Sequence, residues 1–417
     1  MTPALARLKR WILCLVVVVA LLAVWAAPKF WSAPRPADVP YGVVYVPGTE
    51  FFGTQDFAYN LNYLRQIRDK TVAHPYRMED QEQIVKTWLP RASMGMLHAY
   101  SPVALVMALP LLAMPVERAF AFFTFFNAVL LVLLTSLYLL PRIKNVTQAG
   151  AVLAGFCGYV LLDTFNMGQT SIATTCILAA GFVLLQGRVT LARDVLLGLL
   201  LSVLCAKPSV AIVLVALLLG EKIWRALIIT AFGLALTWLC LAPHYGGYLR
   251  GLQDYSWLLS HYSREDAIPF MKPGANPAIS TSFSSYLTVL WPDRNREIFQ
   301  VCRYLFEGLV LVLIVARWRK AITLSQQWQG LLWTFLLFSP YLLVTEDFAI
   351  CLLAVEGNFF RSGPGASLKV LLVFLMVNTC MGMWTQVPYF FPIKLALAGW
   401  WLLDQILLPR LKSQPLP

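Results

Sequence analysis

An acidic residue, Asp56, stands just past the first hydrophobic run of the chain, within the segment Gly53–Tyr59 (GTQDFAY). A carboxylate held at the surface of a bilayer can act as a general base towards a bound hydroxyl group. Aspartate is also common at the beginning of a helix, where its side chain accepts hydrogen bonds from free backbone N–H groups. Asp56 is therefore either a candidate catalytic base or a helix N-cap.

Three other segments place polar or charged residues where apolar runs are interrupted. They are Asn166–Ser171 (NMGQTS), Ala206–Pro208 (AKP) and Ser339–Asp347 (SPYLLVTED). Broken helices and ionisable side chains at membrane depth usually line a site, because lipid cannot satisfy their polar groups. The candidate site residues that these segments supply are Asn166, Gln169, Lys207, Glu346 and Asp347.

A structural explanation is available for several of these residues. Lys207 could extend its ammonium group from a helix end to the membrane interface, as lysine commonly does. Gln169 could satisfy backbone groups that are freed where two helices break. Asp347 could be a second acid or a cap at the outer face.

Four side chains in the polar loops are looser candidates for binding an anionic group: Arg65, Arg68, His244 and His261. Cationic donors form charge-assisted hydrogen bonds with phosphate oxygens. A solvated position in a loop is the more common explanation for each of them.

The chain contains none of the short motifs that bind metals or nucleotides. It has no D-x-D motif and no histidine cluster, so we expect no metal site. It also has no P-loop and no G-x-G-x-x-G motif, which argues against direct use of ATP or a nucleotide sugar. We therefore expect no cofactor.

The composition defines the elements that must position these residues. Hydrophobic residues make up 59% of the chain and charged residues only 13%, which is typical of a polytopic membrane protein. Apolar runs recur from Trp11 to Leu408 and predict about eleven to thirteen membrane segments. Several are shorter than the ~20 residues of a spanning helix, so some should be re-entrant or half-spanning. The first run, Trp11–Ala27, is interpreted as a retained anchor and not as a cleaved signal.

The formal net charge of +12 does not indicate nucleic acid as a partner. Arginine and lysine occur in short clusters between apolar runs, which is the positive-inside pattern of membrane proteins. These clusters are Arg142/Lys144, Arg188/Arg193, Lys222/Arg225, Arg317/Arg319/Lys320 and Arg410/Lys412. The eight cysteines are scattered through apolar runs and predict neither disulfides nor a zinc site.

Two long polar stretches should lie outside the membrane on the same side, within a single domain of residues 1–417. The first external loop, 28–100, carries Asp56, and near-helical spacing over Ala58–Arg68 predicts a short helix on the membrane surface. The second, 243–300, is rich in aromatic residues. Placing the basic clusters in the cytoplasm requires segment 101–115 to enter the membrane without crossing it.

The order of several motifs resembles the polytopic membrane glycosyltransferases of the GT-C class, and within it glycosyltransferase family 87. The first motifs are Asp56-Phe57 with Tyr59, Tyr100-Ser101-Pro102, Leu109-Pro110-Leu111 and Asn166 with Gly168-Gln169. The series continues with Gly187-Arg188, Leu197–Leu200, Lys207-Pro208, Trp224–Ala226 and Ser339–Tyr341 with Asp347.

The resemblance implies a helical GT-C bundle and an inverting transfer of a hexose, with mannose as the first choice. The implied donor is a polyprenyl-phosphate sugar, and the implied acceptor is a glycolipid or glycan at the non-cytoplasmic face of a bacterial inner membrane. Asp56 occupies the position of the base, and Lys207 and Arg65 are assigned to the donor phosphate. The implied substrate contacts are Tyr59, Tyr100, Asn166, Gln169, His244, His261, Glu346 and Asp347.

Two other functions are compatible with the residues alone. A lipid or solute transporter, including a flippase, also combines many spans with broken helices and intramembrane charges. Transporters often contain internal repeats, and we find no convincing repeat here. A third possibility is a degenerate family member with a structural role.

Overall fold

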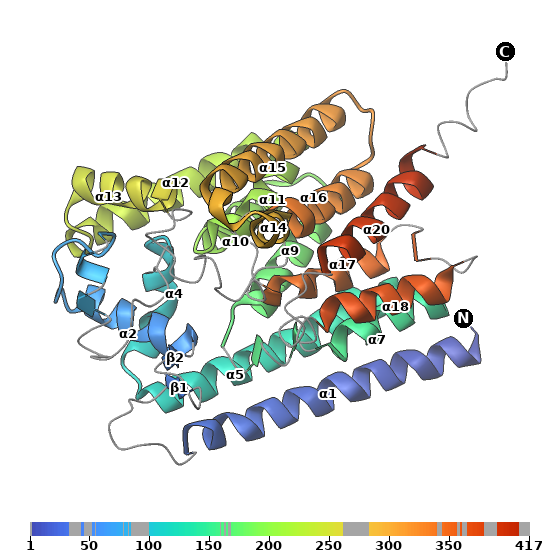
Figure 1. Ribbon diagram of the computed structural model, residues 1–417, viewed down its shortest axis with the longest axis horizontal. Coiled ribbons are helices and arrows are strands. Elements are labelled where there is room, and N and C mark those ends of the chain that lie inside the picture. The colour runs from blue at the N-terminus through green and yellow to red at the C-terminus, as the bar shows by residue number, and fades with distance from the viewer. Residues whose placement is uncertain are drawn as a thin grey trace.

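The computed structural model describes residues 2–32, 43–45, 52–54, 56–77, 79–81, 83–84, 100–158, 160–161, 164–165, 168–261, 283–339, 344–356, 359–360, 365–378 and 390–407. Within these ranges the protein is mostly helical (Figure 1). The predicted all-α integral membrane architecture is confirmed.

The elements before the second external loop are α1 (Pro3–Ser32), β1 (Val43–Tyr45), β2 (Phe52–Thr54), α2 (Asp56–Arg68), α4 (Val103–Leu112), α5 (Val116–Leu133), η1 (Leu134–Leu139), α6 (Leu140–Arg142), α7 (Val146–Phe156), α9 (Ser171–Gln186), α10 (Leu191–Leu204), α11 (Pro208–Gly220) and α12 (Trp224–Leu241). Those that follow are η2 (Ala242–His244), α13 (Tyr248–His261), α14 (Phe283–Leu290), η5 (Pro292–Arg294), α15 (Asn295–Trp318), α16 (Leu324–Phe338), η6 (Val344–Ala349), α17 (Ile350–Val355), α18 (Ala366–Val377), α20 (Phe390–Leu402) and η7 (Leu403–Leu407).

Four of the described helical stretches are long and apolar enough to cross a membrane: Pro3–Ala27, Val116–Arg142, Trp224–His244 and Glu297–Trp318. Shorter apolar helices pack between them. The helix in segment 101–115, α4, has only ten residues and is therefore about 15 Å long, half of the ~30 Å hydrocarbon thickness. This length agrees with a segment that enters the membrane without crossing it.

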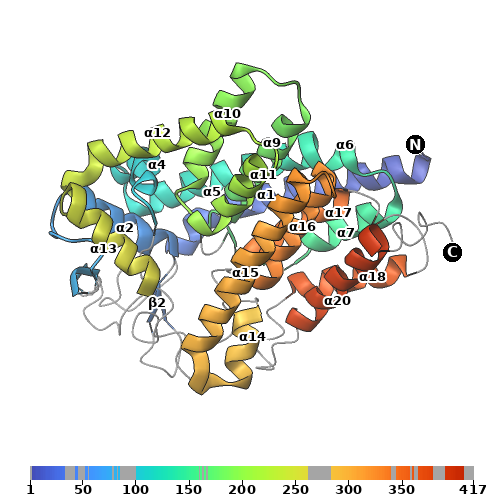
Figure 2. The same ribbon diagram turned by 90° about the horizontal axis from the view of Figure 1, so that it is seen from above.

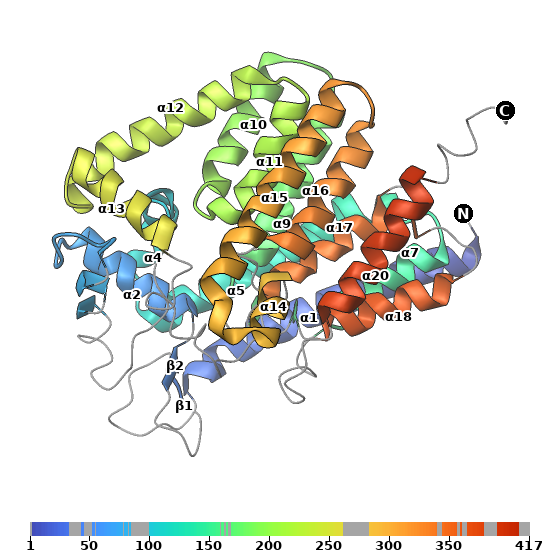
Figure 3. The same cartoon turned by 45° about the horizontal axis from the view of Figure 1, so that its top comes forward.

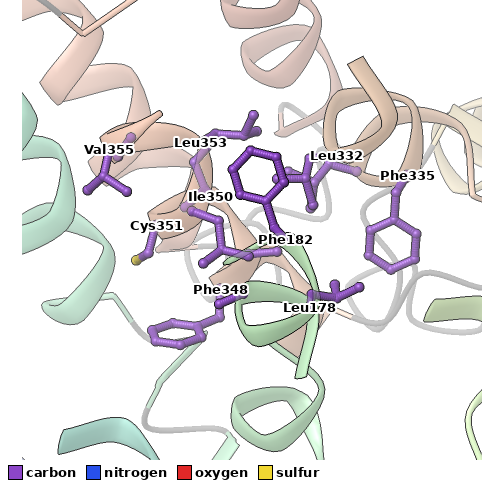
Figure 4. Close-up of a cluster of buried hydrophobic side chains, with 14 of the residues drawn as sticks. Leu178, Phe182, Leu332, Phe335, Phe348, Ile350, Cys351, Leu353 and Val355 are labelled. Carbon is purple, nitrogen blue, oxygen red and sulfur yellow. The ribbon is translucent and has the colours of Figure 1, made fainter. Parts of the chain in front are cut away.

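Most of the helices share one large hydrophobic core. Side chains of α9, α16 and α17 meet in it, and Figure 4 shows Leu178, Phe182 and Leu332 among them. Phe182 stacks on Trp328, with ring centroids 4.8 Å apart. Because lipid is as apolar as these side chains, the short helices are held to the longer ones mainly by close van der Waals packing.

A second, smaller core lies at one end of the bundle, where α2, α4 and α13 gather (Figure 2). α2 covers the predicted Ala58–Arg68 helix and starts two residues earlier. It was predicted to lie on the membrane surface, but Leu61, Tyr63 and Ile67 on it are fully buried by protein. The helical pattern identified the apolar face of α2 correctly. This face packs mostly against other parts of the protein and not against lipid.

The first loop also contains a feature that the sequence analysis did not predict, a two-stranded antiparallel hairpin. Val43 pairs with Thr54 and Tyr45 pairs with Phe52. β-Branched and aromatic residues favour strands. Strand β2 ends two residues before Asp56, so the hairpin leads the chain directly into the start of α2.

A buried ion pair joins η6 to α20 inside the large core. The Lys394 ammonium donates to Asp347 Oδ1 at 2.5 Å and to the Leu336 carbonyl oxygen at 3.3 Å. Both charged side chains are fully buried. Each charge is costly to bury alone and is tolerated because the other compensates it.

We predict that Lys394→Met destabilises the fold by about 3–5 kcal/mol, because it leaves the Asp347 carboxylate buried without its counter-charge. The double variant Lys394→Met/Asp347→Leu should recover most of that loss, since an apolar pair of similar volume removes both charges. Thermal unfolding of the purified protein in detergent measures both effects. A double variant no more stable than the single one would contradict this account.

Candidate active site

A cavity of about 380 Å³ opens between α2, α4, α5, α9 and the end of α10. Three residues selected from the sequence line it together: Tyr100, Gln169 and Lys207. They come from positions up to about a hundred residues apart. Figure 1 shows α2 and α4 at the left end of the bundle, beside the start of α5.

The cavity is lined mostly by apolar side chains, with a few polar ones among them. Its polar lining residues include Asn60, Thr170 and the buried side chains of Gln169 and Lys207. Its apolar lining includes Leu64, Met107, Leu111, Phe122, Phe123, Phe126 and Ile177. Met107, Phe122 and Phe126 are also about half exposed, so the cavity opens onto the apolar surface of the bundle. In a bilayer this opening faces lipid.

A helix break sets the position of Lys207. α10 ends at Leu204 and α11 begins at Pro208, so Lys207 lies between the two helices with φ −122°. Proline suits the first position of a helix, and it keeps the preceding residue out of the helical conformation. Ser101 Oγ donates to the Cys205 carbonyl oxygen at 2.7 Å, which ties this break to the segment that carries Tyr100.

The turn before α9 makes a close contact with the first turn of α2. Gly168 has φ +64°, and a Cβ atom added there would lie 2.5 Å from Cβ of Phe57. Phe57 also packs on Phe120 and Phe123, with ring centroids 5.5 and 5.0 Å apart. Because Phe57 lines the cavity and follows Asp56, this contact brings the start of α2 to the cavity.

Tyr100 is held by a cluster of tyrosines from the two long polar segments, 28–100 and 243–300. Tyr76 Oη donates to the Tyr100 carbonyl oxygen at 3.0 Å, and the Tyr76 ring stacks on Tyr245 and packs on Tyr255. Burial, reinforced by the neighbouring tyrosines, raises the pKa of Tyr76 well above its ordinary value. Its hydroxyl therefore stays protonated and remains a donor at neutral pH.

A salt bridge strengthens the same connection between the loops. Arg77 Nε lies 3.2 Å from Asp254 Oδ1 on α13, and His74 Nδ1 lies 3.5 Å from the other carboxylate oxygen. The two loops that were predicted to share one side of the membrane therefore pack against each other, and their contacts support Tyr100.

Three of the predicted site residues do not line the cavity and have other partners. Arg65 donates to the carbonyl oxygens of Leu112 and Met114 at the end of α4, a favourable role for a cation at a helix C-terminus. Burial lowers the pKa of Arg65 from its ordinary value. His244 Nδ1 lies 3.2 Å from the backbone oxygen of Ile67. The carboxylate of Asp347 accepts a hydrogen bond from Lys394.

Five predicted site residues lie wholly or partly outside the described residues. Asn166 is outside entirely. For Asp56, Tyr59, His261 and Glu346 the backbone is described within α2, α13 and η6, whereas the side chains are not. Within the described ranges, His, Cys, Asp and Glu side chains form no group of three that could hold a metal ion.

Asn60 also lines the cavity, although it is not among the site residues predicted from the sequence. Asn60 follows Asp56 by four positions on α2, and residues with this spacing share one face of a helix. It lines the cavity together with Leu61 and Leu64. The helical spacing from Asp56 was the signal that could have identified it.

The fold and the cavity define a polytopic helical membrane protein whose site combines a lysine with a mostly apolar lining open to lipid. The family model of glycosyltransferase family 87 matches residues 98–345, more than half of the chain. The protein belongs to this family and is a membrane glycosyltransferase. No curated protein and no solved structure matches the chain. The matched region contains Tyr100, Gln169 and Lys207, whereas Asp56, Tyr59 and Arg65 precede it.

We predict that Gly168→Ala strongly reduces activity. The new methyl group must displace Phe57, and alanine resists the left-handed conformation by about 1–2 kcal/mol. A shift of about 1 Å at a catalytic group can lower the rate on the order of 10²-fold. The measurement is kcat of the purified variant at unchanged protein concentration.

Gly399→Ala is the matched control, because a Cβ atom at Gly399 meets open space. It should retain the activity of the wild-type protein. Normal kcat in Gly168→Ala, with a properly folded protein, would refute the role of this contact.

Proposed function

We propose that this glycosyltransferase moves a hexose, with mannose as the first candidate, from a polyprenyl-phosphate carrier to a glycolipid or glycan acceptor. The observation that carries the proposal is the cavity itself, which combines the buried Lys207 with a mostly apolar lining that opens towards lipid. Such a cavity suits a donor with a charged head and a hydrocarbon tail. The tail can remain in the bilayer while the sugar phosphate lies beside Lys207.

Lys207 is proposed to bind the donor phosphate. Its side chain is buried, and an ammonium group interacts more strongly with an anion in such surroundings than in water. Charge develops on the phosphate oxygen as the sugar leaves, so a fixed cation there stabilises the transition state. Arg65, which caps α4, is then a residue that supports the shape of the cavity and not a ligand of the phosphate.

Asp56 is proposed as the general base of an inverting displacement. Its carboxylate takes the proton of an acceptor hydroxyl while that oxygen attacks the anomeric carbon from the face opposite the phosphate. The bond between the anomeric carbon and the phosphate oxygen breaks, and its electron pair remains on the polyprenyl phosphate. The packing of Phe57, the residue after Asp56, against Gly168 at the cavity supports this assignment.

The sugar contacts are proposed in two groups. Asn60, Tyr100 and Gln169 line the cavity and offer hydroxyl and amide groups for sugar hydroxyls. Asn166, Tyr59, His261 and Glu346 remain predictions. His244 and Asp347 are assigned to holding the fold, because their partners, the Ile67 backbone oxygen and Lys394, do not line the cavity.

The proposed location of the site is the non-cytoplasmic face of a bacterial inner membrane. The span Val116–Arg142 has 27 residues, so about 40 Å of helix separates its two ends. Its Phe122 and Phe123 line the cavity, whereas Arg142 lies at the far end. Trp224–His244 likewise has Lys222 and Arg225 at the end away from the external loops. The positive-inside rule places these basic ends in the cytoplasm.

We predict that Asp56→Asn lowers kcat by about 10²–10⁴-fold, the usual contribution of a general base, with no change in thermal stability. The assay incubates purified protein with labelled polyprenyl-phosphate mannose and extracted envelope lipids, and identifies the product by mass spectrometry. Asp69→Asn is the control, since the Asp69 side chain is half exposed just after α2. Unchanged transfer by Asp56→Asn would disprove the proposed base.

We predict that Lys207→Gln lowers kcat/KM roughly ten- to a hundredfold, because a charged hydrogen bond to the donor phosphate is lost. Lys207→Arg should retain part of the activity, since it keeps the charge. Arg250→Gln, which removes an exposed cation of α13, should have no effect. Steady-state kinetics at varied donor concentration distinguish these results, and normal kinetics in Lys207→Gln would contradict the assignment.

A further inference from the structure

Two helical hairpins meet at the end of the bundle opposite the cavity. One is the turn between α11 and α12, and the other is the turn between α15 and α16 (Figure 3). Arg317 Nε donates to the Glu221 carboxylate, and Trp318 Nε1 donates to the Leu219 carbonyl oxygen at 2.6 Å. Segments almost a hundred residues apart therefore form one surface.

This surface carries a concentration of positive charge, which we call the basic patch. It consists of Lys222, Arg225, Arg319 and Lys320, with the indole rings of Trp224 and Trp318 beside them. All four cationic residues are exposed. In the described part of the chain none of them forms an ion pair, since the Glu221 carboxylate is taken by Arg317. The patch thus offers four cationic side chains to a partner.

The two lysines of the basic patch adopt a left-handed backbone conformation, which is unfavourable for a residue with a Cβ atom. Lys222 has φ +58° and Lys320 has φ +56°. Each follows the end of its helix, where glycine is the preferred residue because it lacks a Cβ atom. A lysine here destabilises the turn relative to glycine. Lys70, after the end of α2, has the same conformation with φ +54°, so this strain is not confined to the basic patch. It does show that glycine would suit both turns of the patch better than lysine.

The depth of the basic patch in the membrane follows from the helices that end in it. Trp224 begins one of the four long apolar stretches and Trp318 ends another. Their side chains are 51% and 41% exposed, and tryptophan favours the level of the lipid headgroups. Lys222 Nζ lies 6.0 Å from the centre of the Trp318 ring. The cations therefore stand where the hydrocarbon layer meets the headgroups.

We propose that the basic patch is a binding site for an anionic phospholipid, whose phosphate lies among the four cationic side chains and whose acyl chains lie along α12 and α15. Lysine and arginine beside a membrane span attract anionic headgroups. The outward faces of these two helices are apolar, with Phe232 70% and Val312 62% exposed. This site is separate from the donor cavity and does not depend on the sugar that is transferred.

Replacing the two lysines by glycine removes their charge without destabilising the turns that carry them. In Lys222→Gly/Lys320→Gly both turns gain the residue that suits their conformation, so thermal stability in neutral detergent should rise. Each cation near an anionic surface contributes about fivefold in affinity. The double variant should therefore bind phosphatidylglycerol roughly 25-fold more weakly. Native mass spectrometry of the full-length protein, titrated with phosphatidylglycerol against phosphatidylcholine, measures the retained lipid.

The matched control is Lys144→Gln/Arg188→Gln, which removes two exposed charges from other turns at the same end of the bundle. It should retain wild-type binding of phosphatidylglycerol. A higher melting temperature with unchanged lipid binding in the glycine variant would overturn the proposal, as would an equal loss of binding in the control. Displacement of the lipid by inorganic phosphate would show a site for soluble anions instead.

Discussion

Phe57 lies against Gly168 so closely that no Cβ atom would fit between them, and through this contact the first external loop joins the transmembrane bundle. The contact acts together with the buried apolar face of α2 and with the hydrogen bonds from Arg65 to the end of α4. Glycine at position 168 removes the side chain and also permits the left-handed turn that ends the preceding segment. The start of α2 is thereby held at the wall of the cavity.

The same region shows how a membrane protein keeps polar groups within an apolar structure. Lys207 lies at a helix break that is satisfied locally, because Ser101 donates to a backbone oxygen there. Lys394 lies inside the bundle and is neutralised by Asp347. Both lysines are buried, but Lys207 borders the cavity, whereas Lys394 is paired with the Asp347 carboxylate. The surroundings of a buried charge, and not its burial, therefore separate a candidate ligand from a structural ion pair.

The two ends of the bundle differ in chemistry. At one end tyrosines, a salt bridge and the apolar core of α2 build a compact cover beside the cavity. At the other end two hairpins expose four cationic residues and two tryptophans. Helices that connect these ends fix both surfaces at opposite membrane interfaces. Under the two proposals above, the end with the cavity binds the lipid-linked donor, and the basic end faces anionic headgroups.

The sequence by itself determined the class of protein. The length of an apolar run and the basic residues beside it decide how a segment inserts into a bilayer, and both are properties of the local sequence. It also predicted α2, whose helical spacing is local, and the family, whose motifs keep their order along the chain. Only the tertiary structure separated Lys207 and Gln169, which line the cavity, from Arg65, His244 and Asp347, which hold the fold. These roles depend on contacts between distant segments, and the spacing of residues along a chain carries no record of such contacts.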